Sequence, residues 1–353
     1  MISYKVIGVM SGTSLDGIDI AHIHFKKQEK WTFSILKAVT IPYSQEMEDS
    51  LREAIHFDAD QLAEFDTLYT KLLANTIKSF ISTHEITKID AVCSHGHTIL
   101  HQPENGITYQ IGNQEILAAL LQQKVVCDFR VQDVELGGQG APLVPIGDEL
   151  LFSEYDYCLN LGGFANVSFH EDGKRIAYDI CPVNIVLNKY AKQLGFDYDD
   201  KGNLAKSGEY LLQLGQELNN LDYYTQQPPK SLGLEWVQEK IFPLLEASQR
   251  KQIDVLRTFT EHIAQQIARS FKIRSKILVT GGGAYNEYLL SRIQYYKEVT
   301  LVKPSNELLE YKEAVIFGFL GILRLRDEVN CLKSVTGASK NHSSGKIYNL
   351  KAN

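Results

Sequence analysis

Apolar and polar positions along the first forty residues fall into short blocks. Residues 6–9 form an apolar run that suits a buried strand, and the run breaks in the polar sequence SGTS. Apolar positions then return at Ile18, Ile20, Ile23 and Phe25. This pattern predicts a β-hairpin with a polar, glycine-containing turn. Residues 31–41 predict a third strand, so the chain is expected to open with a β-meander.

Apolar residues at helical spacing follow the predicted meander. Apolar residues between positions 62 and 80 share one face of a predicted helix, and residues 91–93 form a short apolar run typical of a buried strand. The order strand, strand, strand, helix, strand matches half of a ribonuclease-H-like domain.

The second half of the chain repeats this theme. Strands are predicted over residues 157–161, 167–169, 175–179 and 276–280. Helices are predicted from Pro182 to about residue 194, over 259–271, and over about 309–327. Each half has an early strand that ends in a glycine turn, which suggests an internal duplication.

The length of the chain implies more than one domain. Its 353 residues exceed what a single hydrophobic core usually holds. We place the boundary within the glycine-rich segment 128–145. Residues 1–140 plus 330–353 are then assigned to an N-terminal domain, and residues 141–329 to a C-terminal domain.

The charge and the cysteine content of the chain argue against some kinds of partner and indicate a cellular compartment. The formal net charge of −7 provides no basic field, which argues against nucleic acid as a partner. Five scattered cysteines without a CxxC pair indicate reduced thiols in a reducing compartment. Because there is no signal-peptide pattern and no apolar run of transmembrane length, no membrane partner is expected and the protein is expected in the cytoplasm.

Three glycine-rich turns are candidates for binding phosphate. The first combines glycines, hydroxyl residues and an acid, and its backbone N–H groups can form an anion-binding nest. An acid beside phosphates makes sense mainly when a cation lies between them, so Asp16 is the candidate ligand of Mg²⁺. The candidate nucleotide contacts here are Gly12, Thr13, Ser14, Leu15, Asp16, Gly17, Ile18 and Asp19.

The other two turns follow predicted strands and contain Gly162 with Gly163, and Gly281 with Gly282 and Gly283. None of the three turns is a Walker loop or a GxGxxG motif, and a glycine after a strand often serves turn geometry alone. Three such turns combined with a meander nevertheless fit an α/β fold of the actin-like type, in which both domains grip one nucleotide. Such a fold has two ribonuclease-H-like domains around a nucleotide cleft.

Asp179 is the candidate catalytic acid. It ends a predicted strand shortly before Pro182, which favours the first position of a helix, so the positive end of that helix should keep the carboxylate ionised. An ionised carboxylate is what a general base needs to activate water or a hydroxyl. Simple capping of the helix by this acid is the alternative.

Other polar residues are candidates for binding a substrate. Arg130 could hold a carboxylate or phosphate, but an intramolecular salt bridge explains it equally well. Glu313 could face a cleft or be an exposed acid in the first turn of the last helix. His95, His97 and His101 are spaced i, i+2 and i+6, which argues against a metal site. They fit polar contacts at the mouth of a cleft, or local turn structure.

Ten motifs follow one another along nearly the whole chain. They are GVMSGTSLDGID (8–19), SHGHTILH (94–101), QIGN (110–113), DFRVQD (128–133), GGQGAPLVP (137–145), NLGGFANVS (160–168), PPKSLG (228–233), VTGGGAYN (279–286), EAVIFGFLG (313–321) and SVTGAS (334–339). Together they resemble the signature of the anhydro-N-acetylmuramic acid kinases, and the first and fifth are the most specific.

The resemblance implies the actin-like ATPase and sugar kinase fold, an activity and a set of ligands. Members of this family use ATP and Mg²⁺, cleave the 1,6-anhydro bond of anhydro-N-acetylmuramate with water, and phosphorylate O6 to give N-acetylmuramate 6-phosphate, which recycles cell-wall sugar. They are usually dimeric, so a homodimer is expected. By motif, Asp179 corresponds to the acid that activates the water, and residues 281–283 to those against the nucleoside. Arg130, Glu313 and His97 correspond to positions on the sugar side.

Several positions depart from the family pattern. Gln is usual where His97 stands, Asp where Asn113 stands, and His where Asp148 stands. The usual TGPGN after the catalytic acid is ICPVN here, with Val183 in place of a glycine, and Asn188 replaces an acid. These changes leave two alternatives open, which are a kinase for a related amino or anhydro sugar and a catalytically silent nucleotide-binding relative.

Overall fold

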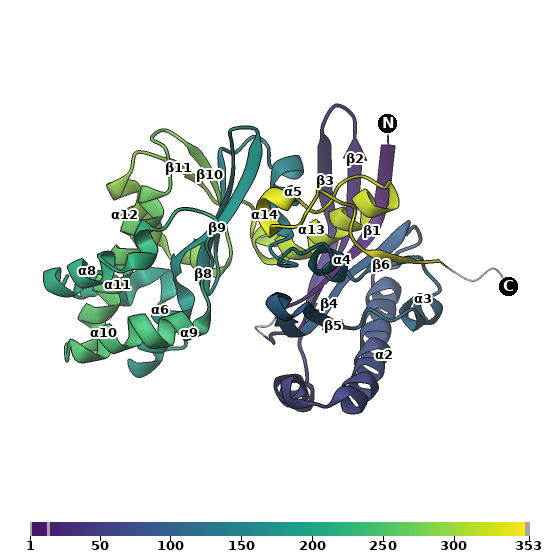
Figure 1. The fold of residues 1–353 in the computed structure, drawn as a ribbon, viewed down its shortest axis with the longest axis horizontal. Helices are drawn as coiled ribbons and strands as arrows, with labels where there is room; N and C mark the ends of the chain where they lie inside the picture. The colour runs from purple at the N-terminus through teal and green to yellow at the C-terminus, as the bar shows by residue number, and fades with distance from the viewer. Residues whose placement is uncertain (1, 13–14, 350–353) are drawn as a thin grey trace. The chain divides into compact units, whose positions relative to one another are not determined.

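The computed structural model describes residues 2–12 and 15–349, which divide into two compact units (Figure 1). The first unit comprises Met1–Leu151 and Tyr311–Asn353, and the second comprises Phe152–Glu310. The first unit therefore includes residues 141–151 and 311–329, which the sequence assigned to the C-terminal domain. The reason is that helix α5 (Val144–Leu151) and most of helix α13 (Asn306–Leu325) pack on the first sheet.

The first unit is built on a seven-stranded sheet in the order β12-β6-β4-β1-β2-β3, with β5 paired to β4. Its strands are β1 (Ile2–Ser11), β2 (Ile18–Lys27), β3 (Trp31–Ile41), β4 (Ala91–Gln102), β5 (Ile107–Ile111), β6 (Val125–Cys127) and β12 (Lys346–Tyr348). Its other helices are α1 (Gln45–Glu53), α2 (Ala59–Thr83), α3 (Ile116–Leu121), α4 (Val131–Glu135) and α14 (Lys333–Thr336).

The second unit is built on a five-stranded sheet in the order β11-β10-β7-β8-β9. Its strands are β7 (Tyr157–Leu161), β8 (Phe164–Glu171), β9 (Lys174–Pro182), β10 (Lys276–Thr280) and β11 (Thr300–Val302). Its helices are α6 (Asn184–Gln193), α7 (Asn203–Ser207), α8 (Leu212–Asn219), α9 (Leu234–Trp236), α10 (Phe242–Ala247), α11 (Gln252–Arg269) and α12 (Glu287–Tyr296).

The two sheets share one topology. In each, three antiparallel strands form a meander, and its first strand pairs in parallel with the next central strand, β4 beside β1 and β10 beside β7. A further parallel strand follows on the same side, β6 in the first unit and β11 in the second. The duplication is confirmed, and the architecture is the actin-like ATPase and sugar kinase fold with two ribonuclease-H-like sheets.

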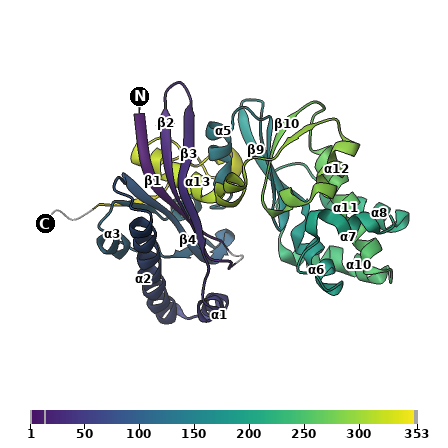
Figure 2. The ribbon, with the colours of Figure 1, turned by 180° about the vertical axis from the view of Figure 1, so that it is seen from behind.

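Helices cover both faces of the first sheet (Figures 1 and 2). Ile7 and Val9 of β1 belong to the same buried cluster as the apolar face of α2. On the opposite face α13 approaches the strand so closely that a Cβ atom at Gly8 would collide with the carbonyl oxygen of Ala314. The glycine in GVMSGTSLDGID at position 8 therefore serves helix-to-sheet packing.

The predicted helix start at Pro182 is wrong. Pro182 does not open a helix but ends β9, where it pairs with Phe164, and α6 begins at Asn184. Proline is tolerated there because β9 is the edge strand of its sheet and needs no further ladder hydrogen bond. As a consequence Asp179 lies inside a strand and not ahead of a helix.

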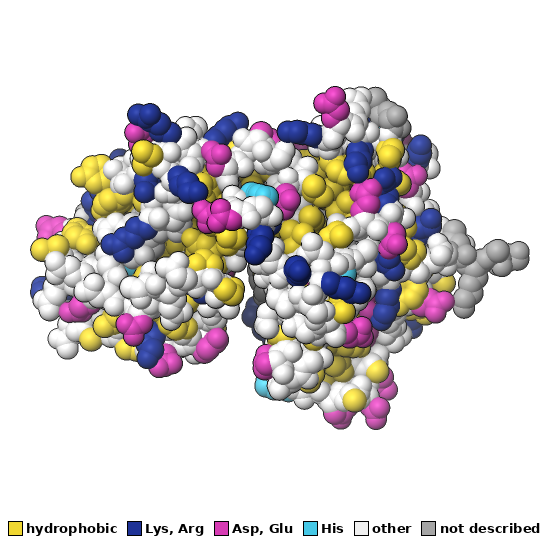
Figure 3. All heavy atoms as spheres, turned by 45° about the horizontal axis from the view of Figure 1, so that its top comes forward, with side chains coloured by type: hydrophobic (Ala, Val, Ile, Leu, Met, Phe, Trp, Pro, Cys, Tyr) yellow, Lys and Arg dark blue, Asp and Glu magenta, His cyan; other side chains and the backbone are white. Residues whose placement is uncertain are grey.

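The surface carries both signs of charge. On the face drawn in Figure 3, basic and acidic side chains are interspersed. Among the helices that the structure describes, none is long and apolar enough to cross a membrane.

Candidate active site

A β-bulge lies beside Asp179 in the second unit. Ala165 of β8 pairs with Cys181 of β9, and Asn166 pairs with Asp179, so Ile180 is an extra residue on β9. Bulges interrupt the alternation of side chains along a strand and often occur next to active sites, where they redirect one side chain. Here the extra residue follows directly after the candidate catalytic acid.

The segment around Leu232 fixes the position of Asp179. The backbone N–H of Leu232 donates to Asp179 Oδ2 at 2.9 Å, and the N–H of Asp179 donates to the carbonyl of Lys230 at 3.2 Å. The Tyr223 hydroxyl donates to the Asp179 carbonyl at 2.6 Å. Within the described residues the other carboxylate oxygen, Oδ1, accepts no hydrogen bond. One oxygen is therefore held and the other is available to a reacting group.

Burial raises the pKa of Asp179, and the Leu232 N–H opposes this effect. This corrects the expectation that a helix end would favour the ionised form, because the strand continues past Asp179 and separates it from α6. A raised carboxyl pKa lies closer to neutral pH, which suits a general base that must also release its proton.

Lys230 is a candidate site residue that the sequence alone does not single out. Its Nζ donates to the Tyr223 carbonyl at 3.1 Å and lies 4.6 Å from the centre of the Tyr223 ring. Burial lowers the pKa of Lys230. The motif PPKSLG contains this residue and was the available signal, but no pattern in the sequence linked it to Asp179.

The two glycine turns of the second unit lie side by side, because β7 and β10 are parallel neighbours and Thr280 pairs with Asn160. The first turn is tied to the start of α6, since the Val183 N–H donates to the Gly163 carbonyl at 2.7 Å. The turns therefore form one continuous glycine-lined edge of the sheet.

Packing explains only some of these glycines. Gly281 has a φ of +80°, and a Cβ atom at Gly283 would lie 2.7 Å from the Leu161 Cβ. By contrast, a Cβ at Gly282 would meet nothing nearer than the Asn184 amide at 3.8 Å, and one at Gly163 would meet nothing within 4 Å. Open space at a glycine is what the approach of a bulky ligand requires.

The turn between β1 and β2 in the first unit is only partly described, since Thr13 and Ser14 lie outside the described residues. The N–H of Leu15 donates to the carbonyl of Gly12 at 3.3 Å. Gly17 has a φ of +147°, and a Cβ there would collide with the Ile41 carbonyl, so glycine is required at this position.

The side chains at the end of this turn differ in exposure. Leu15 and Ile18 are buried in the core, so only their backbone groups can meet a nucleotide. Asp16 is exposed, whereas Asp19 is half-buried and accepts a hydrogen bond from Thr40 at 2.6 Å.

Arg130 is held by neutral partners. Its Nε donates to His95 Nε2 at 2.8 Å, and its Nη1 donates to the Gly140 carbonyl at 2.6 Å. His95 Nδ1 lies 2.9 Å from the Gly96 carbonyl and donates to it, which leaves Nε2 to accept. Burial and the charge of Arg130 lower the pKa of His95, so this ring stays neutral. Arg130 makes no salt bridge to any described residue, and its positive charge remains available.

Glu313 accompanies Arg130 in the first unit. It lies well inside α13, which begins at Asn306, and not in the first turn. Its side chain reaches solvent. Surrounding protein raises the pKa of Glu313, and the charges of Arg130 and Lys312 oppose that rise. The opposite charges of Glu313 and Arg130 thus act on each other.

His97 lies behind the first turn. Its Nδ1 is 2.8 Å from Ser11 Oγ, which is 2.6 Å from the Tyr43 hydroxyl, which in turn is 2.7 Å from the Tyr69 hydroxyl. Burial lowers the pKa of His97 to about 4. This side chain is 3% exposed, so it holds the residue before Gly12, and its direct contact with a sugar stays a prediction.

The residues that depart from the family pattern have local partners. Asp148 forms a buried ion pair with Lys312 at 2.7 Å. The Asn113 side-chain amide donates to the His95 carbonyl at 3.2 Å, which a carboxylate could not do. Val183 is fully buried, and Asn188 lies one turn after Asn184 on α6, partly exposed.

Comparison with known proteins agrees with the family resemblance of the ten sequence motifs. The family model of anhydro-N-acetylmuramic acid kinase matches residues 4–350. A relative of that name from Sulfurimonas denitrificans is 33% identical, over 97% of this chain and 98% of the relative. Another from Acinetobacter baylyi is 31% identical, over 94% of this chain and 96% of the relative. Among solved structures, a glucokinase of the ROK family from Streptomyces griseus aligns with a TM-score of 0.41 at 14% identity, over 90% of this chain and 98% of the glucokinase. On the sequence matches, this chain belongs to the anhydro-N-acetylmuramic acid kinase family.

Proposed function

We propose that this protein is an ATP-dependent sugar kinase that hydrolyses the 1,6-anhydro ring of anhydro-N-acetylmuramate and phosphorylates O6, giving N-acetylmuramate 6-phosphate in cell-wall sugar recycling. The observation that carries the proposal is the carboxylate of Asp179, which has one oxygen held by Leu232 and the other available, in a chain that matches the family from end to end.

The proposed chemistry needs one base. Asp179 Oδ1 takes a proton from water, the water oxygen bonds to C1 of the sugar, and the bond between C1 and O6 breaks. The released O6 then attacks the γ-phosphorus of ATP, and ADP leaves. Because Leu232 holds Oδ2, the base keeps its orientation while its charge changes. Arg130, oriented by His95 and Gly140, provides a fixed positive charge for the carboxylate of the sugar.

The proposed ATP contacts come from the three glycine turns, which are residues 12–19 of the first unit and Gly162, Gly163 and 281–283 of the second. Open space at Gly163 and Gly282 supports the second set. The exposed carboxylate of Asp16 fits Mg²⁺, which prefers oxygen ligands and would neutralise phosphate charge. We further propose that the protein acts as a homodimer in the cytoplasm.

The activity is tested by incubating the protein with ATP, Mg²⁺ and a panel of sugars that includes anhydro-N-acetylmuramate and its open-ring counterpart. We expect phosphorylation of the anhydro sugar, and a loss of about 10²–10⁴-fold in kcat for Asp179→Asn, because an amide cannot accept the proton. ATP affinity of the variant, measured by calorimetry, should be unchanged. Turnover like that of the wild type would remove Asp179 from the mechanism.

The acid limb of the rate profile should report Asp179. A raised pKa means that this carboxyl takes up its proton at a higher pH than an ordinary aspartate, so kcat/KM should fall as the pH drops through that raised value. The residual rate of Asp179→Asn should lack this limb. An acid limb that is the same in both proteins would assign it to another group.

Two adjacent glycines separate ligand binding from packing. Gly282→Val places its side chain in open space, so thermal stability should be kept while ATP binding weakens by about tenfold or more, equal to about 1.4 kcal/mol. Gly283→Val collides with Leu161 and should lose about 1–3 kcal/mol of stability. Calorimetric titration and thermal melts measure both effects. Unchanged ATP affinity in Gly282→Val would argue against a nucleotide at this turn.

His97 should make the fold sensitive to acid. Its pKa is about 4 in the folded state and about 6.5 in the unfolded state, so between these values the unfolded state binds more protons. The free energy of unfolding should therefore fall as the pH drops from 6.5 to 4, by up to about 3 kcal/mol from this residue. In denaturant melts, the free energy of unfolding of His97→Gln should fall less steeply with decreasing pH than that of the wild type. The control His56→Gln, at an exposed histidine, should show the same fall as the wild type. Equal slopes in all three proteins would contradict the assignment.

A further inference from the structure

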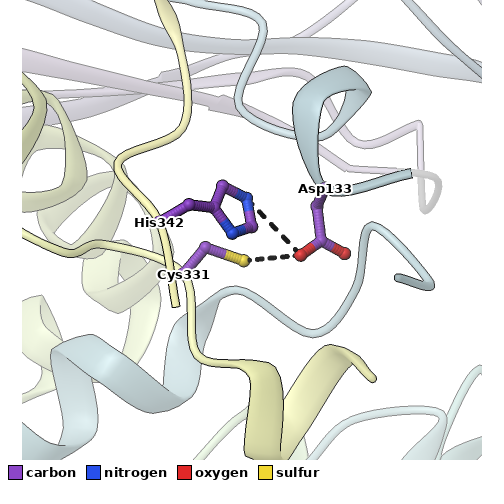
Figure 4. Close-up of side chains that lie close together, drawn as sticks. All are labelled: Asp133, Cys331 and His342. Carbon is purple, nitrogen blue, oxygen red and sulfur yellow. Dashed lines mark hydrogen bonds and ion pairs between the residues drawn. The ribbon is translucent and has the colours of Figure 1, made fainter. Parts of the chain in front are cut away.

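Three potential metal ligands converge in the first unit, apart from the residues discussed above. Asp133 comes from α4, Cys331 from the segment after α13, and His342 from the segment before β12 (Figure 4). Their ligand atoms lie within 4.8 Å of one another, and all three side chains are buried, Asp133 completely. Cys331 Sγ donates to Asp133 Oδ1 at 3.0 Å.

His342 points an unpartnered nitrogen into this cluster. Its Nδ1 is 3.2 Å from the Lys340 carbonyl and donates to it, so the lone pair of a neutral ring lies on Nε2. Nε2 is buried, has no hydrogen-bond partner among the described residues, and faces Asp133 Oδ1 at 3.6 Å. A lone pair facing a carboxylate oxygen is unfavourable unless a positive charge lies between them. A donor bond from Nδ1 to a carbonyl is also what usually orients a metal-binding histidine.

We propose that Asp133, Cys331 and His342 form a binding site for a divalent ion of the zinc class. Thiolate, imidazole and carboxylate are the ligands that zinc prefers, and the ligand atoms of a tetrahedral zinc site lie about 3.3–3.5 Å apart. The observed separations of 3.0 and 3.6 Å from Asp133 Oδ1 bracket that range. The Thr336 hydroxyl, 2.7 Å from the same oxygen, marks the position of a fourth ligand, which it or a water molecule fills.

Binding exchanges one proton for the ion. The thiol of Cys331 gives up its proton to solvent as sulfur bonds to the metal, so each bound ion releases one proton. Asp133 Oδ2 takes no part, because it accepts the Gly140 N–H at 2.7 Å. That hydrogen bond persists in both states and orients the ligating carboxylate.

The site connects the C-terminal segment to the loop that holds Arg130. Gly140 donates to Asp133 through its N–H and accepts from Arg130 through its carbonyl. An ion on Asp133 thus holds α4 and, through Gly140, the end of the segment 130–140, and Cys331 and His342 connect residues 331–342 to it. Its role is structural, and it is distinct from the Mg²⁺ that accompanies ATP.

The test uses the full chain, treated with a chelator and returned to buffer containing excess Mg²⁺ but neither ATP nor sugar. Titration with Co²⁺ should give one equivalent of tight binding, a thiolate-to-cobalt charge-transfer band, and one proton released per ion. Zn²⁺ should displace the cobalt and abolish the band. Because no substrate is present, the result does not depend on the proposed kinase activity.

Variants localise the site. Cys331→Ser and His342→Gln should each lower Co²⁺ affinity by about tenfold or more, and Cys331→Ser should also lose the band. The controls are Cys93→Ser, a buried cysteine of β4, and His56→Gln, and both should behave as wild type. Absence of the band in folded wild-type protein at millimolar Co²⁺, or a Co²⁺ affinity in both cluster variants that equals that of the wild type, would overturn the proposal and leave a hydrogen-bonded triad.

Discussion

The hydrogen bond from the Leu232 N–H to Asp179 Oδ2 is the interaction on which the proposed chemistry depends. A half-buried carboxylate such as that of Asp179 is costly unless a donor compensates it, and a carboxylate with both oxygens hydrogen-bonded would have none left to react. This arrangement satisfies one oxygen only. The β-bulge at Ile180 and the backbone bond to Lys230 keep that oxygen in place, so the strand and the 230–232 segment act as one unit.

Arg130 shows the same principle with the opposite charge. A guanidinium bonded to an acid would be neutralised, whereas here the carbonyl of Gly140 and the neutral ring of His95 orient it and leave its charge uncompensated by any described ion pair. Burial lowers the pKa of Arg130 to about 10, and the charge of Glu313 opposes that shift. The Asp179 carboxylate and the Arg130 guanidinium are each held in a fixed geometry and make no ion pair with a described residue. Electrostatic recognition in a site requires this combination.

The meander of each sheet and the buried strand that pairs with it could be predicted from the sequence, because each of these strands leaves a local pattern of apolar residues. The order of all strands in the two sheets depends on long-range pairing and could not be predicted. The surroundings of Asp179 could not, since its donor comes from a segment more than fifty residues later and nothing in the local pattern encodes that contact. The position of Pro182 at the end of an edge strand, and not at the start of a helix, likewise depends on its pairing with Phe164, which the local sequence does not encode. Cys331 and His342 carry no spacing motif with Asp133, so only the folded chain brings them together.

The division of the chain has a consequence for its synthesis. Residues 152–310 are contiguous and can fold as soon as they leave the ribosome. The other unit needs most of α13 on its sheet and β12 beside β6, so its earlier strands remain an incomplete sheet until residues up to Tyr348 have been translated. During that interval β6 presents an open strand edge, the kind of surface that chaperones shield and that a C-terminal truncation would leave exposed permanently.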